Sequence, residues 1–223
     1  MEVERSKAMS QEIDTIQGSR EWWKLRKGIP TGSNFSRIIT AKKGDYAAGA
    51  KHYAAELIAE ALGWQSGFTG TPETARGNLL EKEALRWLGM HHGIKARECG
   101  FFISDCERYG ASPDGIALKD GCPVEIKCPA LNTFLKWRVD DELPDDHKAQ
   151  CHGEMILTGA DKCYFVAYAD HELLDNWLIV VERDEYTAKL EKHLKRFCTE
   201  LEALQRKLVF EPEMIFPYLE KRL

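Results

Sequence analysis

A short hairpin in the middle of the chain places the strongest constraint on the fold. Two runs of apolar and alternating residues, 115–118 (GIAL) and 123–128 (PVEIKC), are separated by Lys119-Asp120-Gly121. An Asp-Gly pair accepts the positive φ angles of a tight turn, and the flanking runs have the composition of strands. The sequence therefore predicts two antiparallel strands with side chains from both lying close together.

Helices and further strands are predicted on both sides of this hairpin. Other strand-like runs, bounded by turn residues, cover 99–104, 163–169 and 176–183. Apolar spacing and capping patterns predict helices at 21–29, 34–40, 46–62, 76–91, 145–158 and 185–207. This order favours an α/β fold with a central mixed β-sheet flanked by α-helices. Without a repeat or a low-complexity linker, residues 1–223 are expected to form a single domain with N-terminal helical elements and a C-terminal helix.

The composition allows a folded core and predicts no membrane span. Hydrophobic residues make up 43% of the 223 residues and charged residues 30%, which is enough to bury a core and keep a polar surface. No apolar stretch approaches the roughly 18 to 20 residues of a membrane-spanning helix. The charged start of the sequence also lacks the apolar run of a secretion signal. We therefore expect a cytoplasmic protein without a membrane partner.

The seven cysteines predict neither a disulfide framework nor a cluster site. Their number is odd, no two form a Cys-x-x-Cys pair, and an exported protein is not expected. Iron–sulfur clusters need thiolates brought together from close spacings, whereas these are scattered between Cys99 and Cys198. The prediction is therefore free thiols, mostly buried, and no iron–sulfur cluster.

The net charge of −5 argues against a protein that simply coats nucleic acid. It does not exclude an enzyme that acts on nucleic acid. Carboxylates that hold metal ions count as negative charge in the sequence, but the bound ions reverse the local sign. Composition therefore leaves this class of function open.

Three charged residues of the hairpin form a candidate catalytic group. Asp114 precedes the first strand, while Glu125 and Lys127 lie on the second, where alternation places both on one face. A tight hairpin would bring the two carboxylates and the ammonium into one small volume. Two carboxylates with other oxygen ligands suit Mg²⁺, which leaves positions for water and phosphate. Lys127 would then orient or deprotonate the attacking water, or stabilise charge on the phosphorane.

Each half of this pattern also has an ordinary structural explanation. A Glu-x-Lys pair is common on the solvated face of a strand, and Pro113-Asp114-Gly115 is a good turn sequence. Their combination at hairpin spacing is much more specific than either half, and it favours a functional site.

The P-D … E-x-K pattern resembles the signature of the restriction-endonuclease-like nuclease superfamily. Over most of its length the chain also resembles the phage lambda exonuclease family of YqaJ-type viral recombinases. The matching segments are, in order, Trp22-Trp-Lys-Leu-Arg-Lys-Gly-Ile-Pro-Thr-Gly-Ser33, Arg76-Gly-Asn-Leu-Leu-Glu81, Ser112-Pro-Asp-Gly115, Glu125-Ile-Lys-Cys-Pro129 and Ala149-Gln150. Five motifs in the family's order argue against chance similarity, and they imply a restriction-endonuclease-like core.

The resemblance extends the candidate site beyond the hairpin. It implies Mg²⁺, with Mn²⁺ as a substitute and two ions per site, held by Asp114, Glu125, the Ile126 backbone carbonyl and Glu81, the last directly or through water. It also implies a catalytic role for Gln150, which would position Lys127 or the attacking water. The residues alone would make Glu81 a capping carboxylate or an ion-pair partner, and Gln150 a surface amide.

A pocket for the 5′-terminal phosphate is also implied, built from Arg26, Ser33 and Ser112, with Lys43 near a DNA-contacting position. Guanidinium groups grip phosphate with two parallel hydrogen bonds, and hydroxyls supply neutral donors. The residues alone leave other roles open. Arg26 and Lys43 would be surface cations, and the serines would be capping or turn residues, as in the Thr31-Gly-Ser33 turn expected to cap the helix at 34–40. Most of the six tryptophans are assigned to packing.

The function implied by the resemblance is a metal-dependent 5′→3′ exonuclease. It would digest linear double-stranded DNA and leave 3′ single-stranded tails. The resemblance also implies a ring-shaped homotrimer and a single-strand annealing protein as partner. The origin of the sequence would be a bacterium, a phage or a prophage. An endonuclease of the same fold and a non-catalytic DNA-binding or scaffold protein stay open as alternatives. One departure concerns strand separation, because residues 71–75 (TPETA) lack the family's large apolar wedge and Phe68 is the nearest alternative.

Overall fold

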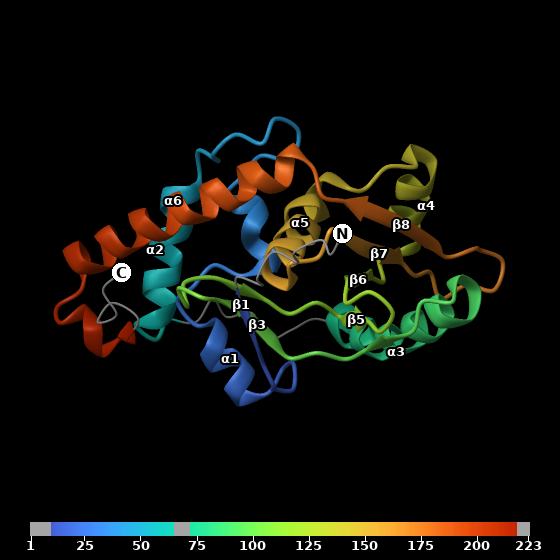
Figure 1. Ribbon diagram of the computed structural model, residues 1–223, viewed down its shortest axis with the longest axis horizontal. Helices are drawn as coiled ribbons and strands as arrows, with labels where there is room; N and C mark the ends of the chain where they lie inside the picture. The colour runs from blue at the N-terminus through green and yellow to red at the C-terminus, as the bar shows by residue number, and fades with distance from the viewer. Residues whose placement is uncertain (1–9, 65–71, 218–223) are drawn as a thin grey trace, which may run out of the picture.

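A five-stranded mixed sheet forms the centre of the fold (Figure 1). The structure, a computed structural model, describes residues 10–64 and 72–217. In spatial order the strands are β2 (Ala96–Arg97), β5 (Gly115–Ala117), β6 (Pro123–Lys127), β7 (Lys162–Ala167) and β8 (Trp177–Glu182). Neighbouring strands are antiparallel except β6 and β7, which run parallel. The predicted α/β fold with a mixed sheet flanked by helices is confirmed.

The predicted hairpin is formed by β5 and β6. Gly115 pairs with Val124, and the Ala117 N–H donates to the Cys122 carbonyl at 2.8 Å, which closes the turn. Gly121 has a φ of +72°, the conformation for which glycine is suited. The Asp120 carboxylate accepts a hydrogen bond from the Cys122 N–H at 3.2 Å. The turn residues therefore act as their sequence predicted.

A parallel pair such as β6 and β7 requires a crossover connection, and two helices provide it. These are α4 (Leu131–Asp140) and α5 (Asp145–Thr158). Most of α5 is buried, because it packs against β6 and β7 on one side and against α6 (Glu185–Leu208) on another. Figure 1 shows α5 between the sheet and the long α6.

The two faces of the sheet meet different helices. Val124 and Ile126 share a core cluster with residues of α3 (Pro72–His92). Cys163 and Phe165 share another cluster with residues of α5. Because side chains alternate along a strand, Glu125 and Lys127 point to the α5 face, opposite Ile126. This arrangement decides which helix completes the candidate site.

The remaining elements flank this core. A second sheet has the order β1 (Ser10–Ile13), β3 (Phe101–Ser104), β4 (Gly110–Ala111). The N-terminal half also holds α1 (Arg20–Arg26), the 3₁₀ helix η1 (Gly32–Arg37) and α2 (Ala50–Ala61), and a second 3₁₀ helix η2 (Pro212–Met214) follows α6. No helix among the described residues is long and apolar enough to span a membrane.

Several boundaries differ from the sequence prediction. The helix expected at 34–40 is the 3₁₀ helix η1; Thr31 is its N-cap residue, but the turn is closed by the Asn34 N–H donating to the Thr31 carbonyl at 2.8 Å and not by a side-chain capping bond. The helix expected at 46–62 begins only at Ala50. The strands β1, β2 and β4 and the helix α4 were not expected. The seven cysteines are free thiols in the structure, and the absence of an iron–sulfur cluster stays a prediction.

Candidate active site

The hairpin brings the three predicted catalytic residues together. Asp114 lies just before β5, and its Oδ2 accepts a hydrogen bond from the Ile126 N–H at 2.6 Å. On β6, the Lys127 ammonium donates to Glu125 Oε1 and forms an ion pair with it. Glu125 is 1% exposed and the Lys127 side chain 29%. A carboxylate is thus buried beside a second carboxylate and a partly accessible ammonium, as the spacing predicted.

Burial and neighbouring negative charge raise the pKa values of Asp114 and Glu81. The pKa of Asp114 lies well above its usual range, because its surroundings exclude water and because Glu125 is close; Lys127 opposes this rise. The pKa of Glu81, half-buried on α3, is also raised, first by burial, with Lys127 lowering it and Glu125 adding to the rise. Glu81 therefore lies within the electric field of the hairpin residues.

Lys127 remains protonated in this environment. Burial alone lowers its pKa, but the negative charges of Glu125 and Asp114 outweigh that effect and raise the pKa above its ordinary value. An ammonium with a raised pKa is a poor proton acceptor at neutral pH. Of the roles open to Lys127, the metal-free geometry favours orienting water or stabilising negative charge over deprotonating the water.

Helix α5 adds Gln150 and a residue that the sequence analysis missed, Glu154. The Gln150 Nε2 donates to Glu154 Oε1 at 3.2 Å, and Glu154 is fully buried. The pKa of Glu154 is raised well above its usual value, first by burial and then by Glu125. The spacing of four residues, which places both side chains on one helix face, could have revealed Glu154. It lies in a segment (HGEMIL, 152–157) that the structure buries.

The donor set fits a divalent cation with few protein ligands. Glu125 Oε2 is buried and has no hydrogen-bond partner, so this carboxylate oxygen is placed to act as a metal ligand. The Lys127 carbonyl accepts a hydrogen bond from the Tyr168 N–H, and therefore points to the β7 side. Because successive peptide groups alternate in direction, the Ile126 carbonyl points to the opposite side, where Asp114 lies.

The described residues hold no ready-made cage for a metal ion. Among them, no three or more His, Cys, Asp or Glu side chains are grouped so that they could hold one. A cation here would therefore rely on two carboxylates, a backbone carbonyl, water and substrate phosphate. Mg²⁺ is usually bound in this way in phosphate-processing sites.

Arg26 and Ser112, two residues of the predicted phosphate pocket, are joined by an aromatic side chain. The Arg26 guanidinium carbon lies 4.0 Å from the centroid of the Trp22 ring, and the Trp22 Nε1 donates to Ser112 Oγ at 2.7 Å. Burial lowers the pKa of Arg26 to about 10, so the guanidinium stays charged at neutral pH. Trp22 is only half-buried and joins these two polar groups, so its assignment to packing was incomplete.

Ser33 and Lys43 are exposed, and among the described residues no hydrogen bond or ion pair joins either of them to Arg26 or Ser112. Ser33 nevertheless follows Gly32, where an added Cβ would lie 3.8 Å from the Gln150 side chain. Phe68, one alternative considered for strand separation, lies outside the described residues.

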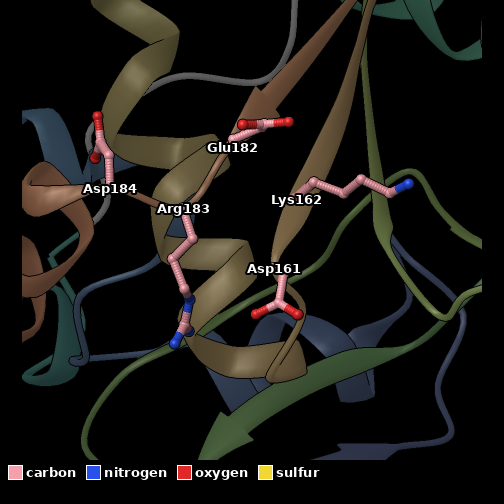
Figure 2. A pocket seen from close by; sticks show the side chains of 5 residues that line it. All are labelled: Asp161, Lys162, Glu182, Arg183 and Asp184. Carbon is pink, nitrogen blue, oxygen red and sulfur yellow. The ribbon is translucent and has the colours of Figure 1, made fainter.

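A surface cavity lies away from the candidate site. A cavity of about 520 Å³ is lined by Asp161, Lys162, Glu182, Arg183 and Asp184, whose charged side chains are shown in Figure 2. It lies at the start of β7 and the end of β8, whereas Lys127 pairs with Ala167 at the opposite end of β7. No predicted site residue lines this cavity.

Comparison with known proteins identifies a domain family and structural relatives of this fold. Residues 21–161 match the YqaJ-like viral recombinase domain. The alkaline exonuclease LHK-Exo from Laribacter hongkongensis is 31% identical, with 85% of this chain and 97% of that chain covered and a TM-score of 0.73. Its complex with dAMP gives 30% identity, the same coverage and a TM-score of 0.72.

A phage-related exonuclease from Haemophilus somnus 129PT has the same fold at 15% identity, covering 81% of this chain and 96% of that chain with a TM-score of 0.65. None of the curated proteins compared with the chain matches it. The domain match spans more than half of the sequence, and the match to LHK-Exo extends over most of it. The chain therefore belongs to the family of YqaJ-like viral recombinase domains, whose structural relatives here are exonucleases.

Proposed function

We propose that the chain is a divalent-metal-dependent 5′→3′ exonuclease that digests linear double-stranded DNA and leaves 3′ single-stranded tails for recombination by strand annealing. The observation that carries the proposal is the group of Asp114, Glu125 and Lys127, with the unpartnered Glu125 Oε2 buried among them. Family membership supports an exonuclease of DNA. The dependence on a divalent metal, the 5′→3′ direction and the 3′ single-stranded product go beyond family membership and are part of the proposal.

Each residue has a distinct part in this scheme. Asp114, Glu125 and the Ile126 carbonyl would hold Mg²⁺ or Mn²⁺, with Glu81 contributing through water. Two such ions, when bound, supply an activated water and neutralise charge on the scissile phosphate. The Lys127 ammonium would donate a hydrogen bond to the attacking water or to a phosphate oxygen.

Gln150 would orient that water from the α5 side. Its amide N–H group is already directed at Glu154, so its carbonyl oxygen is available as an acceptor. An acceptor at this position suits a water molecule, whose hydrogens need partners while its oxygen attacks phosphorus.

The polarity of digestion would come from Arg26 and Ser112. A 5′-terminal monophosphate carries more negative charge than an internal phosphodiester, so a fixed guanidinium gains more by binding it. Ser112 is two residues before Asp114, which places the pocket next to the catalytic group. Ser33 and Lys43, both exposed, would add contacts to the same strand.

The assembly proposed with this activity is a cytoplasmic homotrimer that threads linear duplex DNA and passes the 3′ tail to a single-strand annealing protein. These proposals rest on the family resemblance. A bacterial cell, with a phage or prophage origin for the sequence, is the setting we propose.

The test is digestion of end-labelled linear duplexes and of a covalently closed circle in Mg²⁺, Mn²⁺, Ca²⁺ or EDTA. We expect mononucleotide release from the 5′ end of linear DNA in Mg²⁺ and Mn²⁺ only, because Ca²⁺ coordination is too loose to position the water. Cutting of the closed circle would identify an endonuclease, and DNA binding without cleavage in any metal would identify a scaffold protein.

A further inference from the structure

Trp22 occupies a position between the two polar groups of the candidate phosphate pocket. It lies on α1, four residues before Arg26, so both side chains share one helix face. Its ring contacts the guanidinium, with 4.0 Å from the Arg26 Cζ to the ring centroid. Its indole N–H donates to Ser112 Oγ at 2.7 Å. One side chain thus contacts a helix residue and a residue of the loop that leads to Asp114.

The surroundings of Arg26 point to an anionic ligand. The guanidinium is half-buried, and among the described residues no carboxylate lies within ion-pair distance of it. Within the described part of the chain, one of its amino groups donates a hydrogen bond to Thr31 Oγ1 at 3.2 Å, and the guanidinium makes no other. A guanidinium has five N–H donors, so most of them remain for another acceptor. The negative charge of Glu60 acts on Arg26 from beyond ion-pair distance, so the partly desolvated guanidinium still gains from a directly bound anion.

The hydrogen-bond polarity of Trp22 determines what Ser112 can do. An indole N–H only donates, so Ser112 Oγ must accept at this contact. The hydroxyl hydrogen of Ser112 then points elsewhere and is free to be donated. Phosphate oxygens only accept, and a hydroxyl turned in this way therefore matches them. With a side chain at position 22 that cannot donate, the Ser112 hydroxyl would be free to rotate and donate to a neighbouring carbonyl instead.

We propose that Trp22 is a positioning residue of the terminal-phosphate site: its ring holds the Arg26 guanidinium, and its N–H sets the Ser112 hydroxyl as a donor to the 5′-phosphate. This inference rests on the proposed function, because it takes the 5′-terminal phosphate as the ligand. It extends that function by tying the phosphate pocket to the loop that carries Asp114. Correct seating of the terminal phosphate would thereby fix the loop beside the scissile bond.

The experiment compares duplexes with 5′-phosphate and 5′-hydroxyl ends on wild type, Trp22→Phe, Ser112→Ala and the double variant. Phenylalanine keeps an aromatic face under Arg26 but lacks the N–H donor and one ring of the indole, so the comparison with Ser112→Ala and the double variant isolates the effect of the hydrogen bond. Binding is measured by fluorescence anisotropy in EDTA, and digestion by initial rates in Mg²⁺. We expect Trp22→Phe to lower the preference for 5′-phosphate by roughly 2- to 10-fold in both assays, the range for loss of one neutral hydrogen bond.

Ser112→Ala should cause a similar loss, and the double variant should lose no more than the Ser112 variant alone, because both changes remove one linked interaction. Trp23→Phe is the matched control: among the described residues this exposed tryptophan makes no hydrogen bond to Arg26 or Ser112, and phenylalanine keeps an aromatic ring at its edge contact with Trp22, where the ring centroids lie 4.8 Å apart. It should leave the preference unchanged, and the melting temperature of every variant shows whether the fold is retained.

Two failures are distinguishable. If wild type binds and digests both ends equally, the phosphate pocket itself is refuted and the proposed polarity loses its basis. If wild type prefers 5′-phosphate and Arg26→Ala abolishes the preference while Trp22→Phe retains it, the pocket stands and the role of Trp22 is overturned. Additive losses in the double variant would also overturn it, because they would show that Trp22 and Ser112 act separately.

Discussion

Glu125 and Lys127 neutralise each other in the metal-free site, whereas Asp114 has only a backbone N–H as its close partner. This difference separates their expected effects on stability. Ionised Asp114 is disfavoured, because exclusion of water and the nearby Glu125 raise its pKa. Ionising Asp114 therefore costs free energy in the metal-free site, and a bound cation would reduce that cost. Such a cost is common for active-site carboxylates.

For this reason we expect Asp114→Asn to abolish digestion without lowering the melting temperature of the metal-free protein. Asparagine keeps an oxygen that can accept from the Ile126 N–H but loses the charge that binds metal. The rate should fall about 10²-fold or more, as for other losses of charge stabilisation at a reacting centre. Initial rates and thermal melts in EDTA measure the two effects. Activity near that of wild type would remove Asp114 from the catalytic group.

Lys127→Ala should affect the chemical step more than metal binding. The proposed ligands stay in place, so metal affinity by calorimetry should change little. The single-turnover rate should fall about 10²-fold or more, because the donor to the attacking water or the phosphate is lost. Loss of metal binding with an unchanged rate at saturating metal would instead make Lys127 a structural residue.

At the scale of single residues, the sequence predicted the positions of charged side chains that follow the spacing of a hairpin. Asp114, Glu125 and Lys127 were predicted to meet, and they do. Glu154 was missed, because a carboxylate in a mostly apolar helix looks like an isolated surface residue until the packing of α5 is known. Trp22 was assigned to packing, because no sequence pattern shows what an indole N–H contacts.

Among the elements, the β5–β6 hairpin gains support from an ion-pair cluster at its turn. Asp120 Oδ2 accepts from the Tyr164 hydroxyl at 2.7 Å and lies 3.1 Å from the Lys162 ammonium. Partial burial alone raises the pKa of Asp120, but these hydrogen bonds and the one from Cys122 outweigh it and lower the pKa to about 2. The turn is therefore tied to β7.

Asp120→Asn should destabilise the protein by roughly 2 kcal/mol at neutral pH, from the difference between a pKa of about 2 and an unfolded value of about 3.9. The folded pKa is the lower one, so this contribution is present above the unfolded pKa and is lost as pH falls through the folded pKa. The stability gap between wild type and variant, from urea unfolding, should narrow by about half between pH 7 and pH 3. A gap independent of pH would refute the role of the charge.

Element prediction failed where residues are few or the apolar pattern is mixed. The strands β2 and β4 each span two residues, too few for alternation to be recognised. In α4, Leu131, Leu135 and Val139 are exposed and Phe134 is buried. Because three of these four apolar side chains face solvent, their helical spacing does not mark a buried stripe.

For the whole molecule, the proposed homotrimer leads to a prediction about mass. Light scattering coupled to size-exclusion chromatography should give about three times the 25.4 kDa of one chain, both in EDTA and in Mg²⁺. The mass should not depend on DNA if the ring forms before it threads a duplex. A monomer at all concentrations would refute the ring while leaving the chemistry of the hairpin untouched.

The fold class followed from the order of helices and strands, because a hairpin followed by a crossover allows few arrangements. The parallel pairing of β6 with β7 and the placement of α5 between the sheet and α6 did not follow. Both depend on which faces of the sheet and helices pack together. Contacts between distant parts of the chain decide this packing, and local sequence patterns do not show them.

The crossover between β6 and β7 also has a consequence for protein synthesis. The hairpin with Asp114, Glu125 and Lys127 leaves the ribosome before α5 and β7, since the chain is made from its N-terminus. Local pairs such as β5 with β6 can form early, whereas pairing of distant segments waits for the later one. A nascent chain that ends before α5 carries the acidic residues of the hairpin without Gln150 and without β7, the strand that pairs with β6. Under the proposed function, we therefore expect nuclease activity only once the sheet is nearly complete.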